Sequence, residues 1–167
     1  MQRKFVYILL IILLLTSCKI NYSFSGINIA KDVKTFQISY IQNNAMIVEP
    51  GLNEQVRNDL IDNILRRTNL TEVKSNGDLV YEAEISDYST TPVAMTANQT
   101  ASKTRLTISM KLDYTNTKKD ADSFSKTYTW HYDFEANQSL EAVKEQAHKE
   151  IFEKILDDIF NETLAKW

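Results

Sequence analysis

Three segments between residues 79 and 134 alternate between apolar and polar residues at most positions, and this pattern restricts the fold more than any other feature. They span residues 79–86, 105–114 and 124–134. Alternation with a period of two is typical of strands that bury one face and leave the other in solvent. Successive strands of this kind predict an antiparallel sheet with a packed face, which is expected to include Trp130, and a polar face.

One further strand and two helices complete the expected fold. Residues 33–40 alternate in the same way, and apolar residues then recur at spacings of three and four over 53–67, with Asn53 as the expected N-cap. A second amphipathic helix is expected over 139–164. The order β-α-β-β-β-α predicts an α+β domain with a four-stranded sheet, largely antiparallel and open to being mixed, and both helices on one face.

The N-terminal segment precedes the folded domain. Arg3 and Lys4 are followed by an apolar run over 5–15, which at eleven residues is too short to span a bilayer. Leu15-Thr16-Ser17-Cys18 resembles a bacterial lipobox, in which the chain is cleaved before the cysteine and the sulfur is diacylated. The alternative is an ordinary signal peptide with an incidental cysteine, but Cys18 is the only cysteine. We therefore expect a signal peptide at 1–17 and a lipid-anchored mature chain.

Composition argues against most enzymatic and nucleic-acid-binding functions. The net charge is −3, the pI is near 5.4, and one Cys and two His leave little for a disulfide framework or a metal site. No nucleophile elbow, zinc-binding helix motif or Gly-rich phosphate loop occurs. His131 is expected on the polar strand face and His148 on the exposed side of the last helix. No catalytic residue, metal ligand, cofactor or nucleic-acid partner is predicted.

A polar segment over residues 89–103 is expected to be a long irregular loop between two strands. Long loops inside a compact domain are usually functional or disordered. One interpretation is a contact loop, in which Lys103 and Arg105 meet phosphates or acidic groups of a partner. The other is a mobile hairpin connection, in which Arg105 pairs across the sheet with Glu82 or Glu84.

The lipobox, a short tether over 18–32, the order of the elements and the closing amphipathic helix together resemble the LptE family in its Bacteroidetes form. The segments that support the resemblance are Tyr22–Gly26, Leu79–Ile85, Thr104–Ile108 and Ile159–Trp167. The likeness covers essentially the whole mature chain, with a single LptE-like α+β domain at 33–167.

The resemblance implies an outer-membrane lipoprotein, anchored on the periplasmic side, that plugs the LptD barrel and helps deliver lipopolysaccharide to the cell surface. Its implied partners are an LptD-type β-barrel, lipopolysaccharide, and the membrane through the acyl chains; no enzymatic activity is implied. No lipopolysaccharide-contacting residue of the family is carried over to this sequence. From their place on the loop 89–103 and on the polar strand face, Lys103, Arg105, Ala97 and Thr107 are expected to contact lipopolysaccharide or the partner. A different interpretation is a free periplasmic lipoprotein that binds or activates another envelope protein.

The lipid anchor can be tested with the substitution Cys18→Ala. This variant lacks the sulfur that accepts the acyl chains, so we expect no incorporation of labelled palmitate and an accumulation of uncleaved precursor. Labelling of growing cells followed by electrophoresis measures both. Normal palmitate incorporation by the variant would contradict the assignment.

Overall fold

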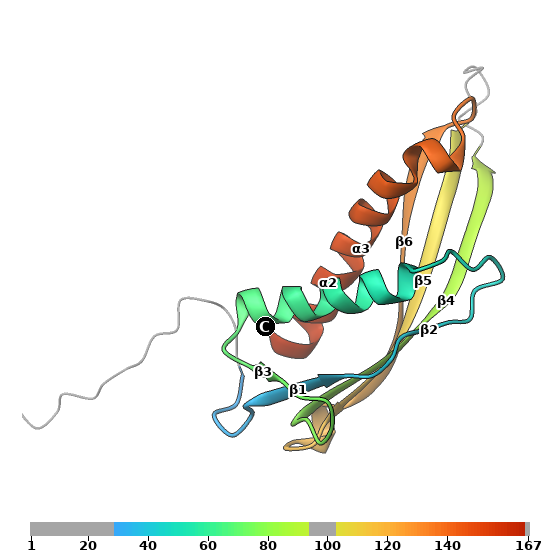
Figure 1. Ribbon diagram of the computed structural model, residues 1–167. Coiled ribbons are helices and arrows are strands. Elements are labelled where there is room, and N and C mark those ends of the chain that lie inside the picture. Colours follow the sequence, from blue (N-terminus) through green and yellow to red (C-terminus); the bar gives the residue numbers. More distant parts are fainter. Residues whose placement is uncertain (1–28, 94–102, 166–167) are drawn as a thin grey trace, which may run out of the picture.

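The computed structural model describes residues 29–93 and 103–165, which form one sheet and two long helices (Figure 1). In chain order the elements are β1 (Thr35–Ile38), β2 (Gln42–Asn43), α2 (Leu52–Arg67), β3 (Thr71–Glu72), β4 (Leu79–Val93), β5 (Lys103–Asn116), the short 3-10 helix η1 (Asp120–Asp122), β6 (Phe124–Glu135) and α3 (Leu140–Leu164). The α+β class and both helices are confirmed.

The sheet is mixed and has six strands, so the expected four-stranded sheet is wrong in strand number. Strands β4, β5 and β6 form an antiparallel meander, while β1 lies parallel to both β4 and β3, and β2 pairs with β4. Strands β2 and β3 have two residues each, too few to show an alternating pattern in the sequence. The parallel pairing of β1 with β4 aligns Phe36 with Leu79 and requires a crossover, which contains α2.

The hairpin formed by β4 and β5 is longer than expected. Its register extends to Val93 opposite Lys103, so residues 89–93 are strand and do not belong to an irregular loop. Pro92 favoured a loop in the sequence, but β1 and β2 pair with β4 only as far as Ile85. Beyond that point no strand of the described residues pairs with this edge of β4, and strand edges are where proline is tolerated.

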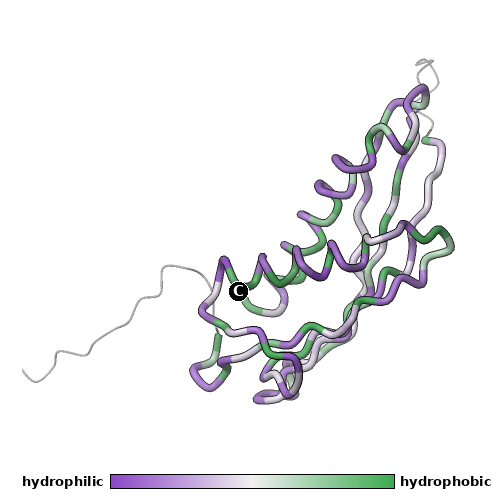
Figure 2. Tube along the Cα trace, viewed as in Figure 1, coloured by the Kyte–Doolittle hydropathy of each residue, from purple (hydrophilic) through white to green (hydrophobic). Residues whose placement is uncertain are grey.

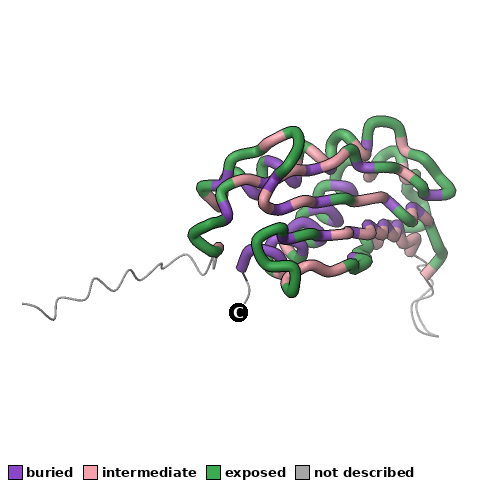
Figure 3. The backbone as a smooth tube through the Cα atoms, turned by 90° about the horizontal axis from the view of Figure 1, so that it is seen from below, coloured by how far each residue is buried: buried purple, intermediate pink, exposed green. Residues whose placement is uncertain are grey.

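Both helices lie on the same side of the sheet, and the core fills the space between the two layers (Figure 1). Along β5, buried residues alternate with partly exposed ones (Figure 3). The apolar stripe of α2 is buried at Leu52, Val56, Leu60, Ile61 and Ile64. The stripe of α3 is buried at Ala147, Ile151, Phe152, Ile155, Leu156, Ile159, Phe160 and Leu164. The periodicity in the sequence therefore identified the packed faces of both helices.

Helix α2 begins in a different way from the one expected. Gly51 precedes the helix with a φ of 78°, in the left-handed region that favours glycine, and no side chain caps the first turn. Asn53 lies inside the helix and its Nδ2 donates to the hydroxyl of Tyr40 at 2.8 Å and to the carbonyl of Ile41 at 3.3 Å. The predicted cap is thus a contact between α2 and the segment that follows β1.

A single carboxylate holds the start of β1 against the start of β4. Asp78 accepts hydrogen bonds from the backbone N–H of Lys34 at 2.8 Å and of Thr35 at 3.0 Å, and from Thr35 Oγ1 at 3.0 Å. Its other oxygen pairs with Lys118 Nζ at 2.8 Å. The ammonium group of Lys118 and these donors hold the pKa of Asp78 well below its usual range. Asp78 therefore joins β1, β4 and the turn that contains η1.

Trp130 was expected in the packed core, and this expectation is only partly met. It pairs with the fully buried Ile108 and so belongs to the core side of the sheet, yet its side chain is 41% exposed. The reason is that β6 is the last strand of the meander and has a neighbouring strand on one side only. Tyr128 and Phe134, two and four residues away, are buried.

The difference between these positions can be measured as a difference in stability. Phe152→Ala, in the buried stripe of α3, should lower the free energy of unfolding by about 3–5 kcal/mol, because a large buried side chain leaves a cavity. Trp130→Ala should cost about half of that or less, and Thr129→Ala on the outer face about 0.5 kcal/mol. Urea unfolding followed by circular dichroism measures all three. If Trp130→Ala lowered the free energy of unfolding as much as Phe152→Ala, the Trp130 side chain on strand β6 would have to be buried in solution.

Candidate functional site

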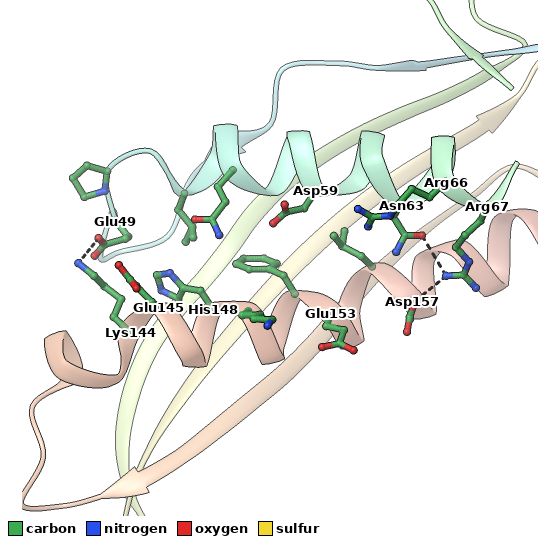
Figure 4. Close-up of a pocket in the computed structure, with 16 residues that line it drawn as sticks. Glu49, Asp59, Asn63, Arg66, Arg67, Lys144, Glu145, His148, Glu153 and Asp157 are labelled. Carbon is green, nitrogen blue, oxygen red and sulfur yellow. Dashed lines mark hydrogen bonds and ion pairs between the residues drawn. The ribbon is translucent and has the colours of Figure 1, made fainter. Parts of the chain in front are cut away.

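A groove of about 1030 Å³ runs between α2 and α3 on the helical side of the molecule (Figure 4). Its apolar lining comes from Leu52 on α2 and from Phe152 and Leu156 on α3. Charged residues make up most of the remaining lining: Glu49, Asp59, Arg66, Arg67, Lys144, Glu145, Lys149, Glu153 and Asp157. Five acidic and four basic groups nearly balance, so the groove is amphipathic and does not concentrate cations against a phosphate.

Ion pairs hold the groove together near both ends. Lys144 on α3 pairs with Glu49 at 2.8 Å and with Glu141 at 2.9 Å, and these two carboxylates raise the pKa of Lys144. Arg67, in the last turn of α2, pairs with Asp157 at 2.8 Å and lies 3.5 Å from the centre of the Phe160 ring. Figure 4 shows both pairs as dashed lines. One ion pair thus joins the two helices directly, and the other joins α3 to the turn that precedes α2.

His148 lies in the groove lining, and the expectation that it is exposed is wrong. Its side chain is 5% exposed and its Nε2 is 3.0 Å from the hydroxyl of Tyr88 on β4. Burial lowers the pKa of His148 and raises the pKa of Tyr88 to about 12. The signal was present in the sequence, because position 148 falls on the same helical stripe as Ile151 and Phe152, three and four residues later.

The two predicted contact cations lie together on the outer face of the sheet, away from the groove. Arg105 forms a bidentate pair with Asp133, with Nε–Oδ1 at 2.6 Å and Nη2–Oδ2 at 2.8 Å, and it lowers the pKa of Asp133. Lys103 lies 3.8 Å from Glu135. Arg105 is therefore paired across the sheet as one interpretation expected, but toward β6 and not toward Glu82 or Glu84 on β4.

The remaining predicted site residues have different outcomes. Thr107 lies on β5 between Ser89 of β4 and His131 of β6, and His131 is exposed as expected. Ala97 and Cys18 lie outside the described residues. The groove between the helices was not predicted, because it is formed by residues about 90 positions apart in the sequence.

Two observations concern the described parts of the chain only. Within residues 29–93 and 103–165, no group of three His, Cys, Asp or Glu side chains is placed to hold a metal ion. Among the helices of that same part, none combines the length and the apolar character needed to cross a membrane.

The fold and these surfaces define a two-layer α+β domain with an amphipathic groove on its helical side and a polar face on its sheet. A family model described as LptE, Lipopolysaccharide-assembly, matches residues 33–163. The chain therefore belongs to the LptE family, whose members are non-enzymatic, envelope-associated lipoproteins that act in lipopolysaccharide assembly.

Several solved structures are similar over most of the chain. A minor lipoprotein from Acinetobacter baumannii is 10% identical, with 77% of this chain and 91% of that chain covered and a TM-score of 0.46. The rare lipoprotein B from Shewanella oneidensis is 15% identical, with coverages of 75% and 89% and a TM-score of 0.41. The PelC dodecamer from Paraburkholderia phytofirmans is 8% identical, with coverages of 81% and 90% and a TM-score of 0.47. The comparison with curated proteins gave no match.

Burial of His148 predicts that the domain loses stability in mild acid. Its pKa is lowered from 6.5 in the folded state, so the unfolded chain binds more protons as the pH falls through that value. The free energy of unfolding should therefore decrease between about pH 7.5 and pH 5. His148 is surrounded by Tyr88 from β4, Glu49 from the turn before α2, and Lys144 from its own helix.

Urea unfolding at a series of pH values measures this effect. His148→Gln should have a smaller dependence on pH over the same range, while His131→Gln, on the exposed outer face, should keep the dependence of the wild type. Identical pH profiles for the wild type and His148→Gln would contradict the assignment.

Proposed function

We propose that this protein is an outer-membrane lipoprotein that plugs an LptD-type barrel and takes part in the transport and insertion of lipopolysaccharide. The observation that carries the proposal is the match to the LptE family over residues 33–163. In this proposal residues 1–17 are removed, Cys18 carries the acyl chains on the periplasmic side, and residues 18–32 connect the anchor to the folded domain.

The outer face of the sheet supports this role because its polar groups are largely satisfied within the protein. Ser109 Oγ and Thr129 Oγ1 are 2.8 Å apart, and Lys111 pairs with Asp113 at 3.1 Å. The interior of an outer-membrane barrel is polar. A face of this kind can lie against such a wall without burying unpaired apolar surface or unpaired charge.

Lys103 and Arg105 are the proposed contacts to the phosphates or acidic sugars of lipopolysaccharide. Both already pair with carboxylates of β6, so a glycolipid phosphate would have to replace Glu135 or Asp133. The planar guanidinium of Arg105 binds a phosphate and a carboxylate with the same bidentate geometry, which makes that exchange chemically reasonable.

Photo-crosslinking in intact cells tests the plug role. A crosslinking amino acid at Thr107, on the outer face, and another at Ala97, between β4 and β5, should each capture the LptD-type protein of the same cell. Affinity capture from detergent-extracted outer membranes should bring down the same barrel. Mass spectrometry identifies the product in both experiments.

An abundant, unrelated barrel of the same outer membrane serves as the control and should be absent from both samples. A failure to capture the LptD-type protein from both positions, together with its absence from the affinity sample, would exclude the plug role. A different envelope protein in its place would favour the free periplasmic lipoprotein.

A further inference from the structure

The turn between β2 and α2 exposes three consecutive apolar side chains. Met46 is 98% exposed, Ile47 50% and Val48 60%, and the neighbouring Tyr40 is 68% exposed. Figure 2 shows this turn as a hydrophobic segment at the right-hand edge of the molecule. Single exposed apolar residues are common, but a contiguous cluster usually marks a site of interaction. We call residues 46–48 the apolar tip.

Both ends of the apolar tip are fixed to the body of the protein. On one side, the N–H of Asn44 donates to the carbonyl of Ile85 at 2.9 Å, its side chain donates to Glu84 at 2.6 Å, and Ala45 is buried. On the other side, Glu49 pairs with Lys144 of α3 at 2.8 Å. The tip is therefore held outward, and a partner would meet it without first having to order the loop.

Tyr40 is bound to the first turn of α2, the helix that follows the tip in the chain. Its hydroxyl accepts a hydrogen bond from Asn53 Nδ2 at 2.8 Å. Its side chain nevertheless remains 68% exposed. Met46 adds an unbranched side chain, which adapts readily to the shape of an apolar pocket. The turn is thus fixed at both ends, while the Met46 side chain at its most exposed position can adapt to a partner.

The charges around the tip indicate what it meets. The charged side chains linked to this turn are mostly acidic: Glu84 binds the side chain of Asn44, Glu49 and Glu141 share Lys144, and Glu54 lies in the first turn of α2. We call these four carboxylates the acidic rim. An acidic rim repels anionic lipid surfaces and glycolipid phosphates, which attract Lys and Arg. It also repels the same rim on a second copy of the chain. It is complementary to an apolar pocket on a protein that has Lys or Arg at its edge.

The tip lies apart from the start of the described domain. β1 begins beside β3, where Thr71 N–H donates to Lys34, just after the end of α2. The tip precedes the start of α2, and sixteen helical residues span about 24 Å. The tip and the start of β1 therefore lie at opposite ends of this helix.

We infer that the apolar tip docks into an apolar, cation-rimmed pocket on the barrel protein and seats the domain there. This inference rests on the proposed function, because the barrel is the partner tested. It adds a contact that the polar outer face of the sheet does not provide. It also gives the two parts of the surface different roles. The polar face of the sheet lies against the polar inner wall of the barrel, and the apolar tip buries its side chains in the pocket.

The experiment compares capture of the barrel by the full-length, lipidated protein and by two sets of variants. Met46→Ser, Ile47→Ser and Val48→Ser combined should lower the amount of co-purified barrel by about tenfold or more, as expected for the loss of a buried apolar anchor. Glu54→Lys and Glu141→Lys combined should also lower it, because they reverse the rim. Leu65→Ser, a half-exposed apolar residue on α2 outside the tip, is the matched control and should change nothing.

A crosslinker at Met46 in the otherwise unchanged chain gives an independent measurement and should capture the barrel, while one at Leu65 should not. Equal co-purification of the barrel with the wild type and the triple serine variant would overturn the docking role and leave the plug role standing. Capture of lipid or of a second copy at Met46 would overturn it as well. Absence of the barrel from the wild-type sample would remove the proposed function and this inference with it.

Discussion

The Asp78 carboxylate stands where the N-terminal strand meets the meander, and the rest of the fold depends on the register it fixes. Its bonds to the backbone of Lys34 and Thr35 place Phe36 opposite Leu79. Side chains alternate along a strand, so a slip of one residue would turn Phe36 and Ile38 out of the core. Helix α2 follows β1 in the chain, and its buried stripe is positioned over the sheet only in this register.

Much of the architecture could be read from the sequence, because it rests on local periodicity. The alternation in β4, β5 and β6 and the stripes of the two helices identify the packed faces directly. The elements that were missed depend on contacts far apart in the chain. Strands β2 and β3 have two residues each and therefore show no alternation. Pro92 can continue β4 because no strand of the described residues pairs with the other edge of β4 beyond Ile85. Trp130 has an apolar pattern but lies in an edge strand.

The candidate site was less accessible to the same reasoning. Pairing of Arg105 across the sheet was one of two interpretations, with Glu82 or Glu84 as the expected partner. The actual partner, Asp133, depends on which strand lies on which side of β5, and alternation does not contain that information. His148 was assigned from its charged neighbours, while its place on the buried stripe decided its environment. The groove and the apolar tip arise where α2, α3 and the β2–α2 turn meet, and no single segment contains them.

The parallel pairing of β1 also determines the order in which the chain can acquire its structure. Phe36 is 43 residues from Leu79, and every strand that pairs with β1 follows it in the chain. The meander, by contrast, forms from neighbouring hairpins with short loops, which close at a lower entropic cost. The N-terminal strand therefore remains without its partners until β3 and then β4 have been synthesised. The strand at the N-terminal end of the described domain therefore joins the meander after the local hairpins have formed.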